Sequence, residues 1–404
     1  MYRVIRAIND EIVTTSRNLW AGGTGWILLA ISAGWALSIG LRFVYPALVP
    51  ALQTEFSIEF TTTGLLLTVL WASYAAGHVP GGALGDRLGE GVVLVISGVI
   101  STVAVLLLAT APTVGLLFTA TILFGLATAL YGPTRFTILT DLYSKQAGSA
   151  IGLTMAAGSI GNAAFPALAA FISGALSWRF GFGIFLPMFA IVTVALWLLV
   201  PSRMSTESSA VDELSLDLLR NLSRGITVKD VPVVVGVQVT LSFMIQGFSS
   251  FYPAYLIEAK RLSPEVAAML FGGFFLLGAV IQPITGVLMD RIGIRATMIG
   301  CLSVCVSALA LLPFADSFIT LVTITCLFAL WNGTPVVTQT YIADTLPADM
   351  QGTGFGMLKA GWMLIGATAP ALIGFMADVG RFDEAFMLLA VVGAIGLALA
   401  LPHL

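Results

Sequence analysis

Long apolar runs, separated by charged residues or by Gly and Pro, follow one another along almost the whole sequence. We place them near residues 26-50, 62-85, 91-111, 113-140, 148-173, 180-200, 232-256, 265-289, 295-314, 317-342, 352-377 and 382-402. A run of about 20 apolar residues suits a helix that crosses a bilayer, whereas a membrane strand shows about ten residues of alternating polarity. Since lipid cannot satisfy backbone polar groups, each run must be helical. The pattern therefore predicts an all-α membrane protein with twelve transmembrane helices.

One long polar stretch interrupts this pattern between the sixth and the seventh run. It begins PSRMSTESSAVDELSLDLL and has the composition of a linker. We therefore predict an N-terminal segment at 1-25, a six-helix bundle at 26-200, a linker at 201-231 and a second six-helix bundle at 232-404.

The composition supports this interpretation and excludes several functions. The 404 residues are 58% hydrophobic and 10% charged, with a mean hydropathy of +0.99, which is far from the average of a soluble domain. A net charge of -3 without a Lys/Arg run argues against a nucleic-acid partner. The three cysteines have no His or acidic neighbour at metal-binding spacing, so we expect no metal and no cofactor. Two histidines cannot supply the acid-base set of an enzyme, so we predict a non-enzyme.

The basic residues predict the orientation. With the N-terminus inside, 13 of the 18 Lys and Arg residues fall in inner segments, four fall in outer segments, and Arg42 lies within the first run. This distribution follows the positive-inside rule. We expect a multi-pass protein of the cell (cytoplasmic) membrane, with both termini and the linker on the cytoplasmic side.

An eight-residue motif occurs twice. GALGDRLG at 82-89 recurs as GVLMDRIG at 286-293, and the same offset of 204 residues relates Pro166-Ala167-Leu168 to Pro370-Ala371-Leu372. One offset thus holds from the second run to the fifth. An internal repeat in a twelve-span chain predicts two pseudo-symmetric bundles around a central site, as in secondary transporters.

The pattern G-x-L-x-D-R-x-G between runs two and three, repeated between runs eight and nine, resembles the major facilitator superfamily along the whole chain. The resemblance implies two six-helix bundles, a monomer, and secondary active transport by rocker-switch alternating access, as a symporter or an antiporter. It also implies that the motif helps to hold the outward-facing state. The motif residues in this chain are Gly82, Asp86, Arg87, Gly89, Gly286, Asp290, Arg291, Gly293 and Arg295.

The motif has expected roles and one departure. Gly82 and Gly89 are expected to let the turn pack closely. Asp141 and Asp344, near the inner ends of runs four and ten, are the expected partners of Arg87 and Arg291, respectively. The family usually has basic residues just after the last glycine, but the first copy continues with Glu90-Gly91, so the latch in the first half is expected to differ.

Arg42 is the first candidate for binding a substrate. It lies inside an apolar run, where a charge costs about 2.5–3.5 kcal/mol even on the lenient insertion scale. No Asp or Glu lies in the apolar interior of the runs, so the sequence offers no obvious partner for a fixed internal ion pair. The alternative is that Arg42 snorkels to the outer headgroups.

Further candidates share helical faces in the runs expected to line the cavity. They are Tyr45 on the face of Arg42, Trp71 and Tyr74 in the second run, Gln246 in the seventh, Trp331 and Asn332 in the tenth, and Lys359 in the eleventh. Packing explains the aromatic and polar stripes equally well, and Lys359 could instead reach inner headgroups. Arg135 fits a gate, a surface residue or a ligand. His78 is the candidate proton carrier, and its alternative role is packing.

Cations without internal carboxylates favour an anionic substrate. We therefore predict a transporter of a small organic anion, such as a carboxylate, with the lipid bilayer and a coupling proton or cation as further partners. The alternative is a multidrug or hydrophobic-metabolite exporter of the same superfamily. AAGSIGNAAFP at 156-166 looks a little like the signature of nitrate and nitrite porters, but the arginines that those porters place in the second and eighth spans are missing here. A non-transporting sensor would be expected to add a soluble output domain.

Overall fold

The computed structural model describes residues 19–20, 23–144, 146–202, 231–345 and 353–403, which form helices joined by short turns. The first half consists of α2 (Thr24–Phe56), α3 (Phe60–Leu88), α4 (Glu90–Ala109), α5 (Val114–Leu142), α6 (Ala147–Ala175), α7 (Trp178–Gly183) and α8 (Phe185–Leu199). The second half consists of α10 (Val231–Glu258), α11 (Pro264–Ile292), α12 (Ile294–Leu311), η2 (Leu312–Phe314), α13 (Phe318–Phe328), η3 (Ala329–Gly333), α14 (Thr334–Thr345), α15 (Thr353–Gly366), α16 (Ala369–Asp378) and α17 (Phe382–His403). The predicted linker lies, except for its ends, outside the described residues, as does most of the predicted N-terminal segment.

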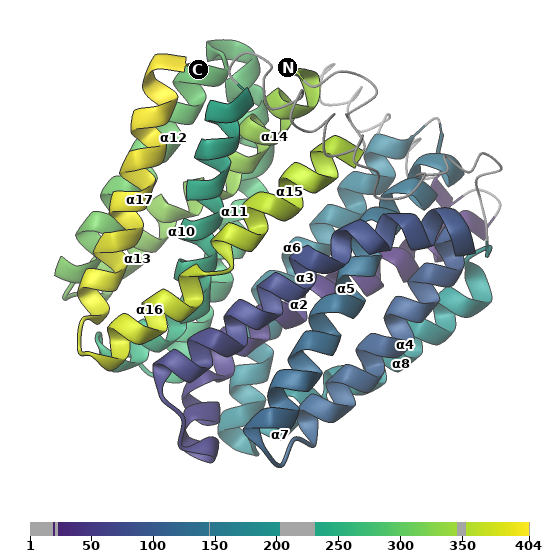
Figure 1. The fold of residues 1–404 in the computed structure, drawn as a ribbon, viewed down its shortest axis with the longest axis horizontal. Helices are drawn as coiled ribbons and strands as arrows, with labels where there is room; N and C mark the ends of the chain where they lie inside the picture. The colour runs from purple at the N-terminus through teal and green to yellow at the C-terminus, as the bar shows by residue number, and fades with distance from the viewer. Residues whose placement is uncertain (1–18, 21–22, 145, 203–230, 346–352, 404) are drawn as a thin grey trace, which may run out of the picture.

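The twelve predicted runs correspond to these helices, so the all-α prediction is confirmed. Eleven spans in the described part are long and apolar enough to cross a membrane. The remaining run is α3, a 29-residue helix that lies among the spanning helices in Figure 1. Three successive threonines at 61–63, His78 and the charges at 86 and 87 make α3 less apolar than its neighbours.

The two halves form two helix bundles, which lie side by side in Figure 1. The repeat also appears in the helix boundaries, because α11, α12 and α13 begin 204 residues after α3, α4 and α5. The bundles meet where α3 contacts α15 and α16, where α6 contacts α11, and where α2 contacts α10. The predicted pseudo-symmetric architecture is therefore confirmed.

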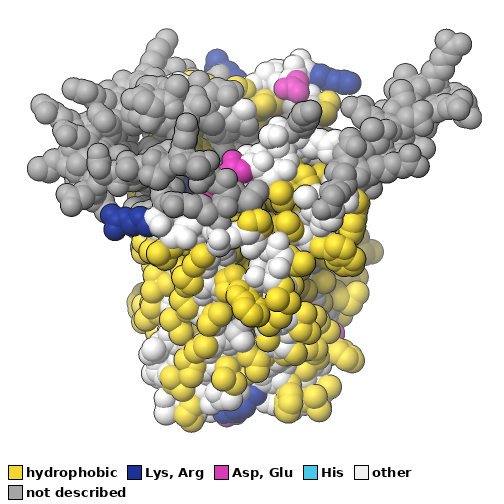
Figure 2. All heavy atoms as spheres, turned by 90° about the vertical axis from the view of Figure 1, so that its right-hand side faces the viewer, with side chains coloured by type: hydrophobic (Ala, Val, Ile, Leu, Met, Phe, Trp, Pro, Cys, Tyr) yellow, Lys and Arg dark blue, Asp and Glu magenta, His cyan; other side chains and the backbone are white. Residues whose placement is uncertain are grey.

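The outer surface is suited to lipid. The middle of the face in Figure 2 is largely covered by hydrophobic side chains, and the charged side chains visible there gather toward its ends. Several large apolar side chains are strongly exposed, among them Ile319, Trp197 and Phe171. Exposure on this scale would favour aggregation in water, whereas a bilayer accommodates it.

Proline breaks one helix of the repeat and not its counterpart. Pro166 lies inside the continuous helix α6, whereas Pro370 follows the break between α15 and α16. Proline lacks an N–H and disfavours helical geometry in the residue before it, so such a break is expected. The break also leaves the Ala371 N–H without its helical acceptor, and this N–H donates to Thr68 Oγ1 of the other half at 3.1 Å.

The two halves are closed against each other at the end of the bundle where α3 begins and α16 ends. Both oxygens of Asp378 accept hydrogen bonds from the start of α3, from Phe60 N at 2.8 Å and from Thr61 N at 2.7 Å. A carboxylate is favourable there because a helix N-terminus carries free N–H groups and a partial positive charge. Gly64 lies against the Pro370 carbonyl oxygen in the same contact. We name this contact, between Phe60–Thr68 of α3 and α16, the α3–α16 closure.

Candidate functional site

Arg42 lies in the interior of α2 and is only 1% exposed. Its Nε donates to the Ser38 carbonyl oxygen one turn earlier at 3.0 Å, while its Nη2 is buried without a partner among the described residues. The Arg42 side chain is therefore buried inside the protein and does not extend to the surface, as the snorkelling alternative would require. A buried guanidinium N–H without an acceptor is costly.

Aromatic rings surround this guanidinium. The Arg42 Cζ lies 3.6 Å from the ring centroid of Tyr74, 5.7 Å from that of Trp71 and 5.9 Å from that of Trp35. Aromatic faces attract a cation, by about 2 kcal/mol or more when water is excluded. This attraction compensates part of the cost of burying the charge, and it leaves the unpartnered Nη2 available to a ligand.

Further charges gather around Tyr74 without a carboxylate. Arg42, Lys359 and Arg135 all interact electrostatically with Tyr74, and Lys359 comes from α15 of the other half. Among the described residues, no carboxylate lies within 4.0 Å of any of these three cations. The ion pairs of the described part of the chain, Arg179–Glu55 and Lys260–Asp316, involve other residues. The structure thus brings together a cationic cluster, which we define as Arg42, Arg135 and Lys359.

His78 lies one turn from Tyr74 and contacts its ring in a T-shaped arrangement, with 4.4 Å between the ring centroids and 83° between the ring planes. Its Nδ1 is 2.8 Å from the Tyr74 carbonyl oxygen, which can only accept, so Nδ1 carries the hydrogen and Nε2 is left to accept a proton. His78 also interacts electrostatically with all members of the cationic cluster. The structure therefore places the candidate proton carrier beside the candidate substrate residues.

Gln246 lies in the second half on α10. Its Nε2 donates to Ser242 Oγ at 2.9 Å and to the Met363 carbonyl oxygen at 3.2 Å. Its buried Oε1 has no partner among the described residues, so it is available as an acceptor for a substrate hydroxyl or amide.

Three predicted site residues lie in packing positions instead. The Tyr45 ring packs against Phe124 and Phe182 within the first half. Trp331 Nε1 donates to the Leu241 carbonyl oxygen, and Asn332 Nδ2 donates to the Ala329 carbonyl oxygen at 3.0 Å. These contacts of the three side chains are all with residues outside the cationic cluster. Helical spacing places Tyr45 on the face of Arg42, but spacing does not determine which neighbouring helix a side chain on that face contacts.

The first copy of the motif differs from the expectation. Gly89 has φ = 91°, a conformation that favours glycine, but a Cβ at Gly82 would meet nothing within 4 Å. Among the described residues, Gly82 therefore shows no close packing partner. In the described chain, Arg87 is exposed and forms no ion pair with Asp141, whereas Glu90 is 3% exposed at the start of α4 and interacts with Asp141 electrostatically.

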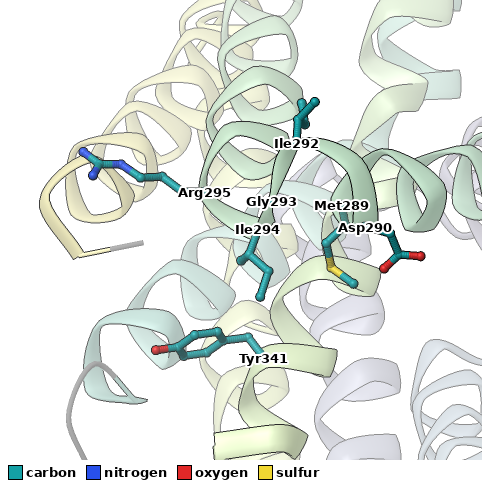
Figure 3. A pocket seen from close by; sticks show the side chains of 7 residues that line it. All are labelled: Met289, Asp290, Ile292, Gly293, Ile294, Arg295 and Tyr341. Atoms are coloured by element: carbon teal, nitrogen blue, oxygen red, sulfur yellow. The ribbon is translucent and has the colours of Figure 1, made fainter.

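The second copy lies beside a pocket of about 540 Å³ (Figure 3). Gly293 has φ = 86°, and a Cβ at Gly286 would meet nothing within 4 Å. Asp290 and Arg295 point away from each other, and Arg295 Nη2 donates to the Leu401 carbonyl oxygen of α17. Arg291 is exposed, and the side chains of Asp86 and Asp344 lie outside the described ones.

Arg135 was left open by the sequence, and it is buried at 2% exposure. Its Cζ lies 3.4 Å from the ring centroid of Trp35, which also faces Arg42. The sequence did show that Arg135 is a charged residue in an apolar run. However, Arg135 lies near the predicted inner end of that run, a position that suits a surface residue equally well.

Two repeated helix bundles with an internal cationic cluster to which both contribute are typical of a membrane transporter. The sequence model of the Major Facilitator Superfamily matches residues 27–263 and 234–403. The chain belongs to this superfamily.

The chain is also similar to individual known proteins. It is 23% identical to the hexuronate transporter of Bacillus subtilis (strain 168), covering 84% of this chain and 85% of that protein. It is 24% identical to the fosmidomycin resistance protein of Escherichia coli (strain K12), covering 92% and 91%. The crystal structure of a bacterial homolog of the human lysosomal transporter Spinster, inward-facing and unoccupied, aligns with a TM-score of 0.76 at 15% identity, over 93% of this chain and 96% of that one.

Proposed function

We propose that this transporter moves a small organic anion, such as a carboxylate, by rocker-switch alternating access. The observation that carries the proposal is the Arg42 guanidinium, which is buried, unpaired by any described carboxylate and left with a free Nη2. A guanidinium binds a carboxylate through two parallel hydrogen bonds, so an anionic group would satisfy both the charge and the N–H. The similarity to a protein named for hexuronate supports the same class.

Alternating access is supported by the contact between the halves. The α3–α16 closure seals one end by backbone and side-chain hydrogen bonds, which can break and reform as the bundles rock. We place that end outside, because the basic residues of the sequence favour the opposite end as cytoplasmic. Both termini are then cytoplasmic, and we expect the protein to work as a monomer.

The main alternative is an exporter of drugs or hydrophobic metabolites. The similarity to a fosmidomycin resistance protein favours it. A cluster of three cations without a described carboxylate favours the anion carrier, because an uncharged substrate would leave these charges unpaired.

Uptake by reconstituted vesicles tests the two functions. Purified protein in liposomes is expected to accumulate or exchange at least one radiolabelled carboxylate from a panel of hexuronates, aldonates and short dicarboxylates. Vesicles without protein and vesicles preincubated with an excess of the unlabelled anion are the controls. Transport of lipophilic drugs but of no carboxylate would contradict the proposal and favour the exporter.

Coupling is tested at His78. If His78 carries the coupling proton, His78→Gln is expected to bind the substrate normally but to lose accumulation driven by a pH gradient, because Gln keeps the size and a donor but cannot titrate. Substrate exchange without a gradient should persist and serves as the control. Parent-like accumulation by the mutant would assign His78 to packing against Tyr74.

A further inference from the structure

Arg135 is a second buried cation of the first half that has spare hydrogen-bonding capacity. Its Nη1 donates to the Gly132 carbonyl oxygen at 3.0 Å, and its Nη2 contacts the sulfur of Met155 at 3.3 Å. Its Nε is buried without a partner among the described residues. Arg135 thus repeats the features that mark Arg42, namely burial, an aromatic face and a free N–H.

Both guanidinium groups lie near the ring of Trp35. The Cζ atoms of Arg42 and Arg135 lie 5.9 Å and 3.4 Å from the centroid of this one ring, so they are at most about 9 Å apart. Two cations this close repel each other in a site with little water. A ligand that carries negative charge toward both would relieve that repulsion.

Lys359 supplies the equivalent charge from the second half. The repeat offset of 204 residues relates Met155 to Lys359 and Arg135 to Gln339. The Arg135 Nη2 contacts the side chain of Met155, the repeat counterpart of Lys359. The charge of Arg135 therefore lies, in the first half, beside the position that corresponds to Lys359 in the second half. Lys359 interacts electrostatically with both Arg42 and Arg135. Each half therefore contributes one cation to the cluster at a related position of the repeat, and Arg42 adds a third.

We propose that the site binds a small organic dianion, with one negative group on Arg42 and the second between Arg135 and Lys359. This inference rests on the proposed function and narrows its substrate class to short molecules with two separated acidic groups. The site holds three cations, and no described carboxylate lies within 4.0 Å of them. One carboxylate of a substrate does not balance this excess of positive charge.

Calorimetry with paired ligands tests the second charge. The full-length detergent-purified protein is titrated with malonate, succinate and glutarate and with the monoamide of each, which has nearly the same shape and one negative charge fewer. We expect at least one dianion to bind tenfold or more tighter than its monoamide. Equal affinities for a dianion and its monoamide would overturn the dianion proposal and leave the anion carrier standing.

Two substitutions taken from the repeat locate the second charge. Arg135→Gln and Lys359→Met each install the residue that the other half has at the equivalent position. Both are expected to reduce the preference for the dianion to less than threefold while changing the affinity for the monoamide less than threefold. Arg135→Lys keeps the charge and should retain most of the preference, which distinguishes lost charge from lost folding. A full dianion preference in both neutral variants would overturn the assignment of these residues.

The outcomes also separate this proposal from the proposed function. Binding of monoanionic hexuronates or aldonates, with no binding of any dianion, would overturn the dianion site alone. Binding of lipophilic drugs, with no binding of any anion, would overturn both.

Discussion

Arg42→Ala is expected to weaken binding of the transported anion by about a hundredfold or more. Removing one partner of a buried charge pair costs about 3–5 kcal/mol, and each 1.4 kcal/mol is a factor of ten in affinity. The side chain is 1% exposed, so water cannot replace the lost guanidinium at that position. Arg42→Lys should lie between the parent and Arg42→Ala, because Lys keeps the charge and loses the planar fork. Calorimetry on correctly folded, purified protein measures the effect.

A structural role for Arg42 predicts a different result. The guanidinium stacks on Tyr74 at 3.6 Å, so its loss also removes a cation–π contact from the first half. If Arg42 acts only through that contact, the yield and melting temperature of Arg42→Ala should fall while the affinity of the folded fraction stays at the parent value. That outcome would remove the main support for an anionic substrate and move the exporter to first place.

Gly64→Val and Gly272→Val are expected to reduce transport at least tenfold by preventing the two halves from closing. A Cβ at Gly64 would collide with the Pro370 carbonyl oxygen, and one at Gly272 would collide with the Ala163 carbonyl oxygen, each across the contact between halves. Backbone atoms cannot move aside as a flexible side chain can. Overpacking costs about 1–3 kcal/mol, and about 1.4 kcal/mol is already enough to shift the population of the closed state tenfold.

Gly273→Val is the matched control. Gly273 follows Gly272 in α11, and a Cβ at Gly273 would meet no described atom within 4 Å. Gly273→Val therefore introduces the same β-branched residue into the same helix, at the same cost in helix propensity, without the collision. Uptake into vesicles gives the transport rate, and spin labels at Thr110 and Asp316 report the separation of the halves at the closed end. The label distance should lengthen in Gly64→Val and stay unchanged in Gly273→Val. Equal transport by Gly64→Val and Gly273→Val would show that this contact does not limit the cycle.

The sequence by itself determined the spans, the repeat and the family. Lipid imposes the spans, because an apolar run of this length can cross a bilayer only as a helix, whatever its neighbours are. The offset read from the motif at 82-89 and its copy at 286-293 reappears as the spacing of helix starts. Arg42 could be recognised early for a similar reason, since a charge in an apolar run is costly wherever the helix packs.

Only the tertiary structure decided which side chains share a site. A membrane helix that packs on several sides carries small and apolar residues all round, so its periodicity does not show which face turns inward. It could not show that Tyr45 packs on Phe124 and Phe182, or that Trp331 and Asn332 donate to backbone carbonyl oxygens. Arg135 lies near Arg42 because both guanidinium groups pack near the ring of Trp35, although Trp35 and Arg135 are 100 residues apart in the sequence. Likewise, Pro166 and Pro370 hold equivalent places in the repeat, yet only Pro370 follows a helix break. The amide freed beyond that break bonds Thr68 of the opposite bundle, a partner that the sequence around it cannot specify.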